Sequence, residues 1–252
     1  MTARRHPSRR TPGSFRIPPS QLQPHVPPLQ RSGVARDFPT WTHEVNARFV
    51  EMLVTAAKNP SVSVGLIAEL RQEWLSLGAA ARTRMARLPY LLLDMRFRDG
   101  PWWQSARTGP RTRSRAARDD FPREAAINLA RALLLLVWNG LRLNPDGACV
   151  LYGIGAPVAR IIVGLRLDAL DELARKHFRQ IRARWEDRPA VWRDLILAAQ
   201  TEKSTAMRSC TLHALQLLAG ELLETAGPAP GRLIKGSEDH ATCAGPTDAR
   251  RG

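Results

Sequence analysis

Arginine and lysine side chains gather in two stretches of this 252-residue chain, and their density suits contact with phosphate groups. One stretch separates two apolar regions, and the other follows a helical pattern. Because Arg and Lys contacts to phosphate supply most non-specific affinity for nucleic acid, we expect these side chains to contact DNA. The candidates are Arg107, Arg111, Arg113, Arg115, Arg118, Arg175, Lys176, Arg179 and Arg182.

The second stretch also has a purely structural explanation. Asp168, Asp171 and Glu172 precede its cations, and this order is the one that the helix macrodipole favours in any surface helix. A recognition helix meets bases with its N-terminal residues, where these carboxylates repel phosphate. If this helix contacts DNA, we expect its later basic turns or the other stretch to do so.

No arrangement of His, Cys, Asp or Glu predicts catalysis or a metal site, because the six histidines and three cysteines are scattered without ligand spacing. Gly153 and Gly155 resemble part of a dinucleotide fingerprint, but the third glycine is missing, so a helix-entry turn is favoured. We expect His177 in the core and Cys149 as a buried apolar side chain rather than a reactive thiol. We therefore predict no enzyme activity, cofactor or metal.

The composition points to an anionic partner. The formal net charge is +15, with 34 Arg and four Lys, although a G+C-rich codon bias also explains the preference for Arg. The cysteines form no disulfide framework, the N-terminus lacks the apolar region of a secretory signal, and the longest apolar run, 132–138, is far shorter than a membrane span. We expect a cytoplasmic protein without membrane association.

The elements that position these side chains are predicted to be helices. Apolar residues recur at helical spacing in most of the chain, and nothing alternates with period two for long enough to predict a sheet, so the fold class is all-α. Residues 90–97 fit either a buried helical turn or an isolated strand, and Asn144 to Gly147 predicts a turn. The predicted helices cover about 41–57, 66–77, 79–88, 125–143, 157–165, 168–185, 189–199 and 204–222.

Changes in composition divide the chain into five parts. The Pro- and Arg-rich start lacks enough apolar surface to order, and a long structureless loop inside a domain is usually functional or a linker. Within that loop, Trp102 and Trp103 either stack on the bases of a single strand or anchor the loop to the core. The parts are a disordered basic arm (1–39), an N-terminal helical segment (40–97), an Arg-rich loop (98–119), a C-terminal helical domain (120–225) and a disordered tail (226–252).

The C-terminal domain contains two helices joined by a short turn, the outline of a helix-turn-helix unit. Pro157 suits the first turn of the first helix, and Asp168 is expected to cap the second. Along the second helix Leu170, Leu173 and His177 belong to one apolar stripe, with the cations beside it. For the preceding helix, we expect Asp120 as the cap and Pro122 in the first turn.

Residues 127–185 resemble the FlhD-type flagellar transcriptional activator subunits. One shared feature is the sequence Ile-Asn-Leu at 127–129, which begins an apolar helix. The others are a segment of small residues with Leu, Gly and Ile at 148–154, the pattern Leu165-x-Leu167, and the final pattern Arg182-x-Arg184-Trp185. The resemblance implies a helical regulator that dimerises and acts on flagellar promoters with a protein partner. It covers under a quarter of the chain.

The sequence therefore predicts a DNA-associated transcriptional regulator that forms a homo-oligomer and works through a protein partner. The alternative is a non-catalytic helical interaction or scaffold protein whose charge only keeps it soluble. An enzyme with an unfamiliar site ranks third.

Overall fold

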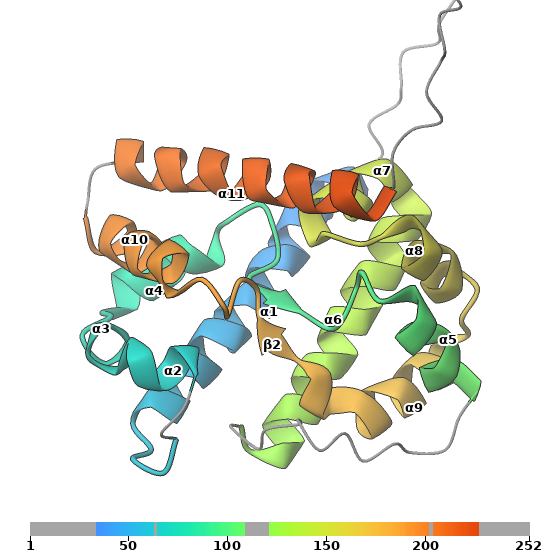
Figure 1. Ribbon diagram of the computed structural model, residues 1–252, viewed down its shortest axis with the longest axis horizontal. Coiled ribbons are helices and arrows are strands. Elements are labelled where there is room, and N and C mark those ends of the chain that lie inside the picture. Colours follow the sequence, from blue (N-terminus) through green and yellow to red (C-terminus); the bar gives the residue numbers. More distant parts are fainter. Residues whose placement is uncertain (1–33, 63–64, 109–120, 202–203, 227–252) are drawn as a thin grey trace, which may run out of the picture.

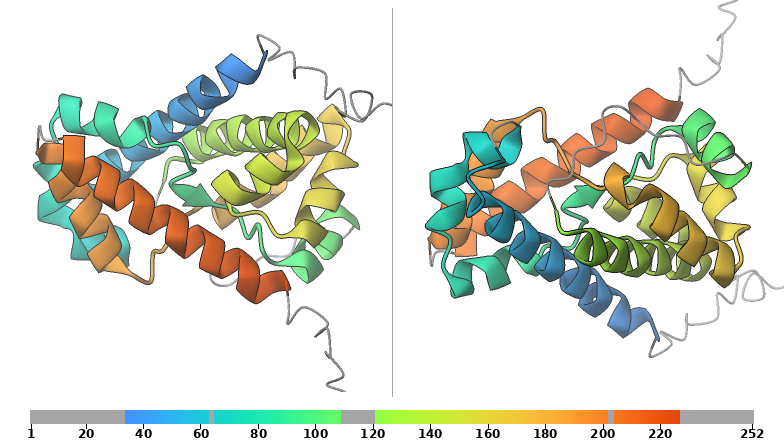
Figure 2. Two further views of the ribbon diagram at one scale, coloured as in Figure 1. Left: turned by 90° about the horizontal axis from the view of Figure 1, so that it is seen from above. Right: turned by 90° about the horizontal axis from the view of Figure 1, so that it is seen from below.

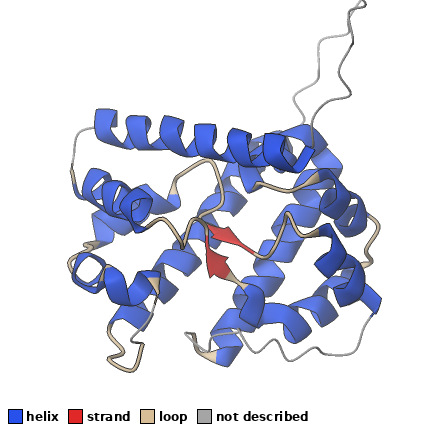
Figure 3. Ribbon diagram, viewed as in Figure 1, coloured by secondary structure: helices blue, strands red, loops and turns tan. Residues whose placement is uncertain are grey.

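A computed structural model describes residues 34–62, 65–108, 121–201 and 204–226. These ranges are largely helical, with one small sheet, which confirms the predicted all-α class (Figures 1 and 3). In chain order the elements are α1 (Val34–Ala57), α2 (Leu66–Glu69), α3 (Arg71–Leu75), α4 (Ala79–Ala86), β1 (Leu93–Asp94), α5 (Gly100–Thr108), α6 (Arg123–Leu143), α7 (Pro145–Tyr152), α8 (Ala156–Val163), α9 (Leu167–His177), the 3-10 turn η2 (Phe178–Gln180), β2 (Arg182–Ala183), α10 (Pro189–Gln200) and α11 (Ser204–Ala226).

Helix α6 is the central helix, as its apolar composition predicts. It packs against α1, α7, α8 and α9 (Figure 2). Its residues Leu133, Leu134 and Val137 are fully buried. The sequence predicts no segment long and apolar enough to span a membrane, and this is wrong for α6. Its length and composition would both allow it to cross a membrane. However, 56% of its most apolar window is buried inside this fold, as in the core helix of a globular protein.

The predicted N-terminal and C-terminal helical parts share one hydrophobic core. Helix α10, from the C-terminal part, packs on α4, and the Trp74 and Trp192 rings lie 5.5 Å apart. The buried Thr42 hydroxyl on α1 lies 3.0 Å from the Tyr152 hydroxyl on α7, at hydrogen-bond distance. Because these contacts join the two parts, neither completes its core alone.

The only sheet in the described ranges joins the same two parts. Strand β1 pairs antiparallel with β2, with Leu93 opposite Ala183, so residues 90–97 contain a buried strand rather than a helical turn. Arg96, just after β1, and Trp185, just after β2, have φ values of 55° and 54°. This left-handed region is strained for residues other than glycine, so the surrounding packing must hold both turns in place.

Several predicted boundaries are wrong. Helix α1 begins at Val34, so residues 34–39 are helical rather than part of the arm, since a helix anchored by packing extends outward at little cost. Residues Gly100–Thr108 form α5 instead of a loop, because Asp99 accepts a hydrogen bond from the Trp102 amide at 2.9 Å and Pro101 fits the first turn.

The predicted starts of two other helices, α7 and α6, are also wrong. Asn144 is the N-cap of α7 and accepts from the Gly147 amide at 3.0 Å, so the predicted turn is the start of a short helix. Pro122 is itself the N-cap of α6 rather than a residue of its first turn. The predicted cap Asp120, residues 1–33 of the arm and residues 227–252 of the tail lie outside the described residues.

Candidate nucleic-acid interface

The predicted helix pair is α8 and α9, joined by a short turn, and both helices pack on α6. Val158 and Ile162 of α8 and Leu170, Leu173 and His177 of α9 are buried, which confirms the predicted apolar stripes. The predicted cap of α9 is wrong. Arg166 occupies the N-cap position with no side-chain cap, while Asp168 lies in the first turn and accepts from Arg166 Nε at 3.2 Å.

The cations of α9 form ion pairs with acidic residues one turn earlier. Arg175 donates to Asp171, which also accepts from Arg131 of α6, and Lys176 Nζ lies 2.5 Å from Glu172 Oε1. These hydrogen bonds, the one from Arg131 most strongly, hold the pKa of Asp171 below its ordinary value. The carboxylate therefore stays charged and competes with any phosphate for these cations.

The two remaining cations of this stretch lie beyond α9, because the helix predicted to reach residue 185 ends at His177; Arg179 belongs to η2 and Arg182 to β2. Arg182 Nη1 donates to Glu186 Oε1 at 2.7 Å, and the Arg179 guanidinium lies 5.4 Å from the centre of the Phe178 ring. The Arg182–Glu186 ion pair contributes little to stability, yet the carboxylate offsets the charge of this arginine locally. The arrangement matches the structural explanation for the charge order along α9 rather than that of a recognition helix.

The Arg-rich segment begins and ends at residues that the core fixes. Ala106, near the end of α5, is buried, and the ring of Phe121, before α6, lies 6.2 Å from that of Phe49. Arg107 and Arg123, close to these two ends, are exposed. Between them, the candidates Arg111, Arg113, Arg115 and Arg118 lie outside the described residues.

Trp102 and Trp103 anchor α5 to the core, so the single-strand stacking alternative loses its basis. Trp103 is fully buried, stacks on Phe97 at 6.1 Å and donates from its indole nitrogen to the Arg96 carbonyl at 3.0 Å. The Trp102 ring packs edge-on against His177 at 5.1 Å. The two tryptophans therefore stabilise the fold here.

Arg184 and Glu221 form a buried charged cluster under α11 that no pattern in the sequence predicts. Arg184 is 3% exposed and donates to the carbonyl oxygens of Leu91 at 3.0 Å and Tyr152 at 2.6 Å. Glu221 of α11, which is 8% exposed, lies 3.9 Å from Arg184 and accepts from the Trp185 indole at 2.7 Å.

The electrostatics of this cluster follow from its burial. Burial lowers the pKa of Arg184, while the negative charges of Asp94 and Glu221 raise it. Arg98 lies 3.6 Å from the same Glu221 carboxylate, which lessens the cost of burying that charge. The cluster thus fixes α7, the strand pair and α11 relative to one another.

Other residues with potential chemistry have structural roles. Gly153, at φ 62°, ends α7, and Gly155 is the N-cap of α8, which confirms the helix-entry turn. Cys149 is half-buried against the core rather than fully buried, and burial raises the pKa of its thiol. In the ranges that the structure describes, no three His, Cys, Asp or Glu residues lie close enough together to hold a metal ion.

Comparison of the chain with protein-family models, with curated proteins and with solved structures finds no match.

Proposed function

We propose that the protein is a DNA-associated transcriptional regulator in which a rigid helical core holds an Arg-rich segment that contacts DNA phosphates. One observation carries the proposal: the residues on either side of the segment 109–120, which contains four Arg and two Asp, pack on the core at Ala106 and Phe121 and include the exposed Arg107 and Arg123. Holding both ends of a basic segment limits the conformational entropy that it loses on binding a phosphate backbone.

The positive charge of the chain supports the same assignment. Residues 1–33 contain six Arg and no Asp or Glu, so a second strongly basic segment precedes α1. The cations of α9, in contrast, have acidic partners. In this proposal the segments 1–33 and 109–120 supply the affinity for DNA, and α9 is a packing element.

The resemblance to FlhD-type subunits supports the regulatory part of the proposal. Residues 127–185 begin within α6, include α7, α8 and α9, and end just after β2. The proposal includes a homo-oligomer, a protein partner and a cytoplasmic location, as the resemblance and composition imply.

The alternative function is that of a helical interaction protein. The observation that favours it is the exposed face of α11, on which Leu212 and Leu223 are 63% and 73% exposed. Exposed apolar side chains of this size mark contact surfaces when they lie together, although scattered ones are normal.

Fluorescence anisotropy with a labelled random-sequence duplex at two salt concentrations separates these functions. A DNA-associated protein binds at about 50 mM salt and loses affinity steeply by about 200 mM, because binding releases condensed counterions. An interaction protein whose charge only maintains solubility shows no binding to the duplex at either salt concentration, and that result would reject the proposal.

A further inference from the structure

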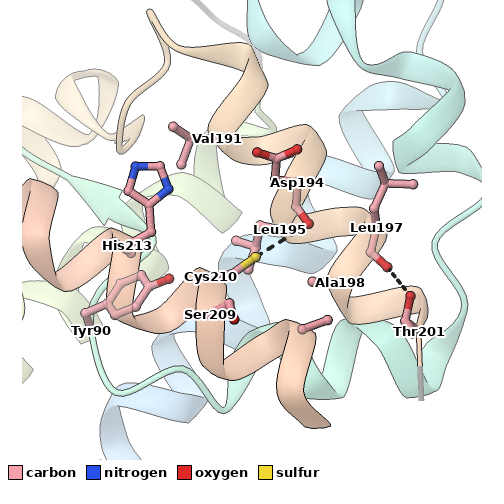
Figure 4. A pocket seen from close by; sticks show the side chains of 12 residues that line it. Tyr90, Val191, Asp194, Leu195, Leu197, Ala198, Thr201, Ser209, Cys210 and His213 are labelled. Atoms are coloured by element: carbon pink, nitrogen blue, oxygen red, sulfur yellow. Dashed lines mark hydrogen bonds between the residues drawn. The ribbon is translucent and has the colours of Figure 1, made fainter. Parts of the chain in front are cut away.

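A cavity of about 540 Å³ lies between α10 and α11, and its walls are mostly apolar (Figure 4). Val191, Leu195 and Ala198 line it from α10, and Ala206 and Ala214 from α11. This volume falls within the range of roughly 300–1,000 Å³ that is typical of small-molecule sites, whose walls are apolar apart from a few placed polar groups.

The buried end of the cavity carries one such polar group, the hydroxyl of Tyr90. Tyr90 is 1% exposed and lines the cavity, and Figure 4 shows its hydroxyl on the side that faces Cys210. No described residue hydrogen-bonds to this hydroxyl. The hydroxyl is accessible from the cavity, since it is not one of the buried polar atoms without a partner among the described residues, and it can bond there to a ligand or an ordered water.

The neighbouring polar groups are already satisfied or lie at the mouth. The Cys210 thiol donates to the Asp194 carbonyl at 3.7 Å, and the Thr201 hydroxyl donates to the Leu197 carbonyl at 2.9 Å. Ser209 and His213 are exposed. Tyr90 is therefore the group that can orient a molecule at the buried end.

The chemistry of Tyr90 defines the ligand class. A tyrosine hydroxyl is protonated at neutral pH, and burial raises its pKa further, so the group can donate a hydrogen bond. An ionised ligand would lose its hydration against the apolar walls. The cation that acts on the Tyr90 hydroxyl, Arg184, is already paired with Glu221 and donates to the Leu91 carbonyl. A neutral molecule with an acceptor oxygen meets both conditions.

We propose that this cavity binds a neutral, mainly apolar small molecule whose carbonyl oxygen accepts a hydrogen bond from Tyr90. None of the cavity residues named above is a candidate DNA contact, so this proposal does not rest on the proposed function. The ligand approaches between α10 and α11, past the polar side chains Asp194, Ser209 and His213.

Benzophenone and diphenylmethane test the proposal, because they have similar shapes and only the first has a carbonyl. Titration of the full-length chain with each probe should show tighter binding of benzophenone by about fivefold, the worth of one net hydrogen bond. Tyr90→Phe should make the two affinities equal. Tyr152→Phe, which removes a buried hydroxyl elsewhere that already bonds to Thr42, should leave the preference intact.

A second variant and a labelling experiment locate the site. Ala206→Trp should fill the cavity and abolish binding of both probes, with circular dichroism confirming that the variant is folded. Irradiated benzophenone forms covalent bonds to nearby C–H groups, so digestion and mass spectrometry should find the label on α10 or α11. Absence of binding by both probes, an unchanged preference in Tyr90→Phe, or a label confined to other elements would overturn the proposal.

Discussion

Arg175 donates a hydrogen bond to Asp171, one turn earlier on α9. The same carboxylate also accepts from Arg131 on α6, so Asp171 links two helices while it neutralises one cation on each. Arg175, Lys176 and Arg182 of the predicted recognition helix therefore belong to ion pairs within the fold. Because these cations already have acidic partners, we expect the DNA contacts to come from the Arg-rich segment rather than from α9.

The pairing of Asp171 predicts a titration behaviour. Because its hydrogen bonds favour the charged form, the pKa of Asp171 is lowered, and the pairing is complete above the ordinary carboxyl pKa and lost as the pH falls through the lowered value. Arg131→Ala should raise this pKa toward its ordinary value more than Arg175→Ala does, since Arg131 has the larger effect. Carbon-detected NMR titration measures it, and an identical pKa in all three proteins would contradict the assignment.

Removal of the buried cation under α11 should destabilise the whole fold. Arg184→Met removes one of the two cations beside the buried Glu221 and leaves the Leu91 and Tyr152 carbonyls without their donor. We expect a loss of about 3–5 kcal/mol in the free energy of unfolding, as for other broken buried pairs. Urea denaturation measures this loss.

The matched control for that variant is Arg188→Met, because Arg188 is exposed and its pairing distance to Asp187 is 4.0 Å. Its effect should stay within about 0.5 kcal/mol. Equal stability of Arg184→Met and Arg188→Met would show that the buried cluster does not hold the fold together.

Two glycine substitutions should have opposite effects. Gly153 has φ 62°, and an added Cβ would collide with the Arg184 guanidinium, so Gly153→Ala should cost more than about 1 kcal/mol. Gly220 lies within α11 with nothing near an added Cβ, so Gly220→Ala should stabilise by about 0.5–1 kcal/mol. Thermal unfolding compares both with the unchanged protein, and the same sign for both would contradict this placement of the turn.

Two buried tyrosines differ in the worth of their hydroxyls. The Tyr152 hydroxyl is 3.0 Å from that of Thr42, so Tyr152→Phe should cost about 1–2 kcal/mol by leaving the buried Thr42 with one partner fewer. Tyr90→Phe should cost nothing measurable, because no described residue bonds to the hydroxyl that it removes. Urea unfolding of both variants tests the difference, and a large loss in Tyr90→Phe would show that its hydroxyl has a structural partner.

Local patterns in the sequence predict most of the helices. The stripe of Leu170, Leu173 and His177 and the apolar surface of α6 follow directly from helical periodicity, so their burial could be predicted. The start of α5 also had a local signal, since Asp99 followed by Gly100 and Pro101 combines a cap with a proline in the first turn. The sequence nevertheless predicts a loop here, because many of the residues that follow are arginines with few apolar residues among them.

Long-range features could not be predicted in this way. From the sequence, Arg184 cannot be told from the surface arginines around it. Its partners Leu91, Tyr152 and Glu221 are far from it in the sequence and come together only in the folded chain. The cavity beside Tyr90 likewise depends on how α10 and α11 cross. Arg175 and Lys176 each follow an acidic residue by four positions, a spacing that allows an ion pair on a helix. The spacing alone does not show that the pairs form, and only the folded chain does.

The salt dependence of duplex binding tests the central claim most directly. Replacing Arg111, Arg113, Arg115 and Arg118 by Ala should weaken binding and reduce the slope of log K against log salt by about 3–4, since each phosphate contact contributes about 0.9. Arg175→Ala combined with Lys176→Ala is the matched control and should keep a slope close to that of the unchanged protein. If instead the α9 variant loses the slope and the four-arginine variant retains it, the assignment of DNA contact to the Arg-rich segment is wrong.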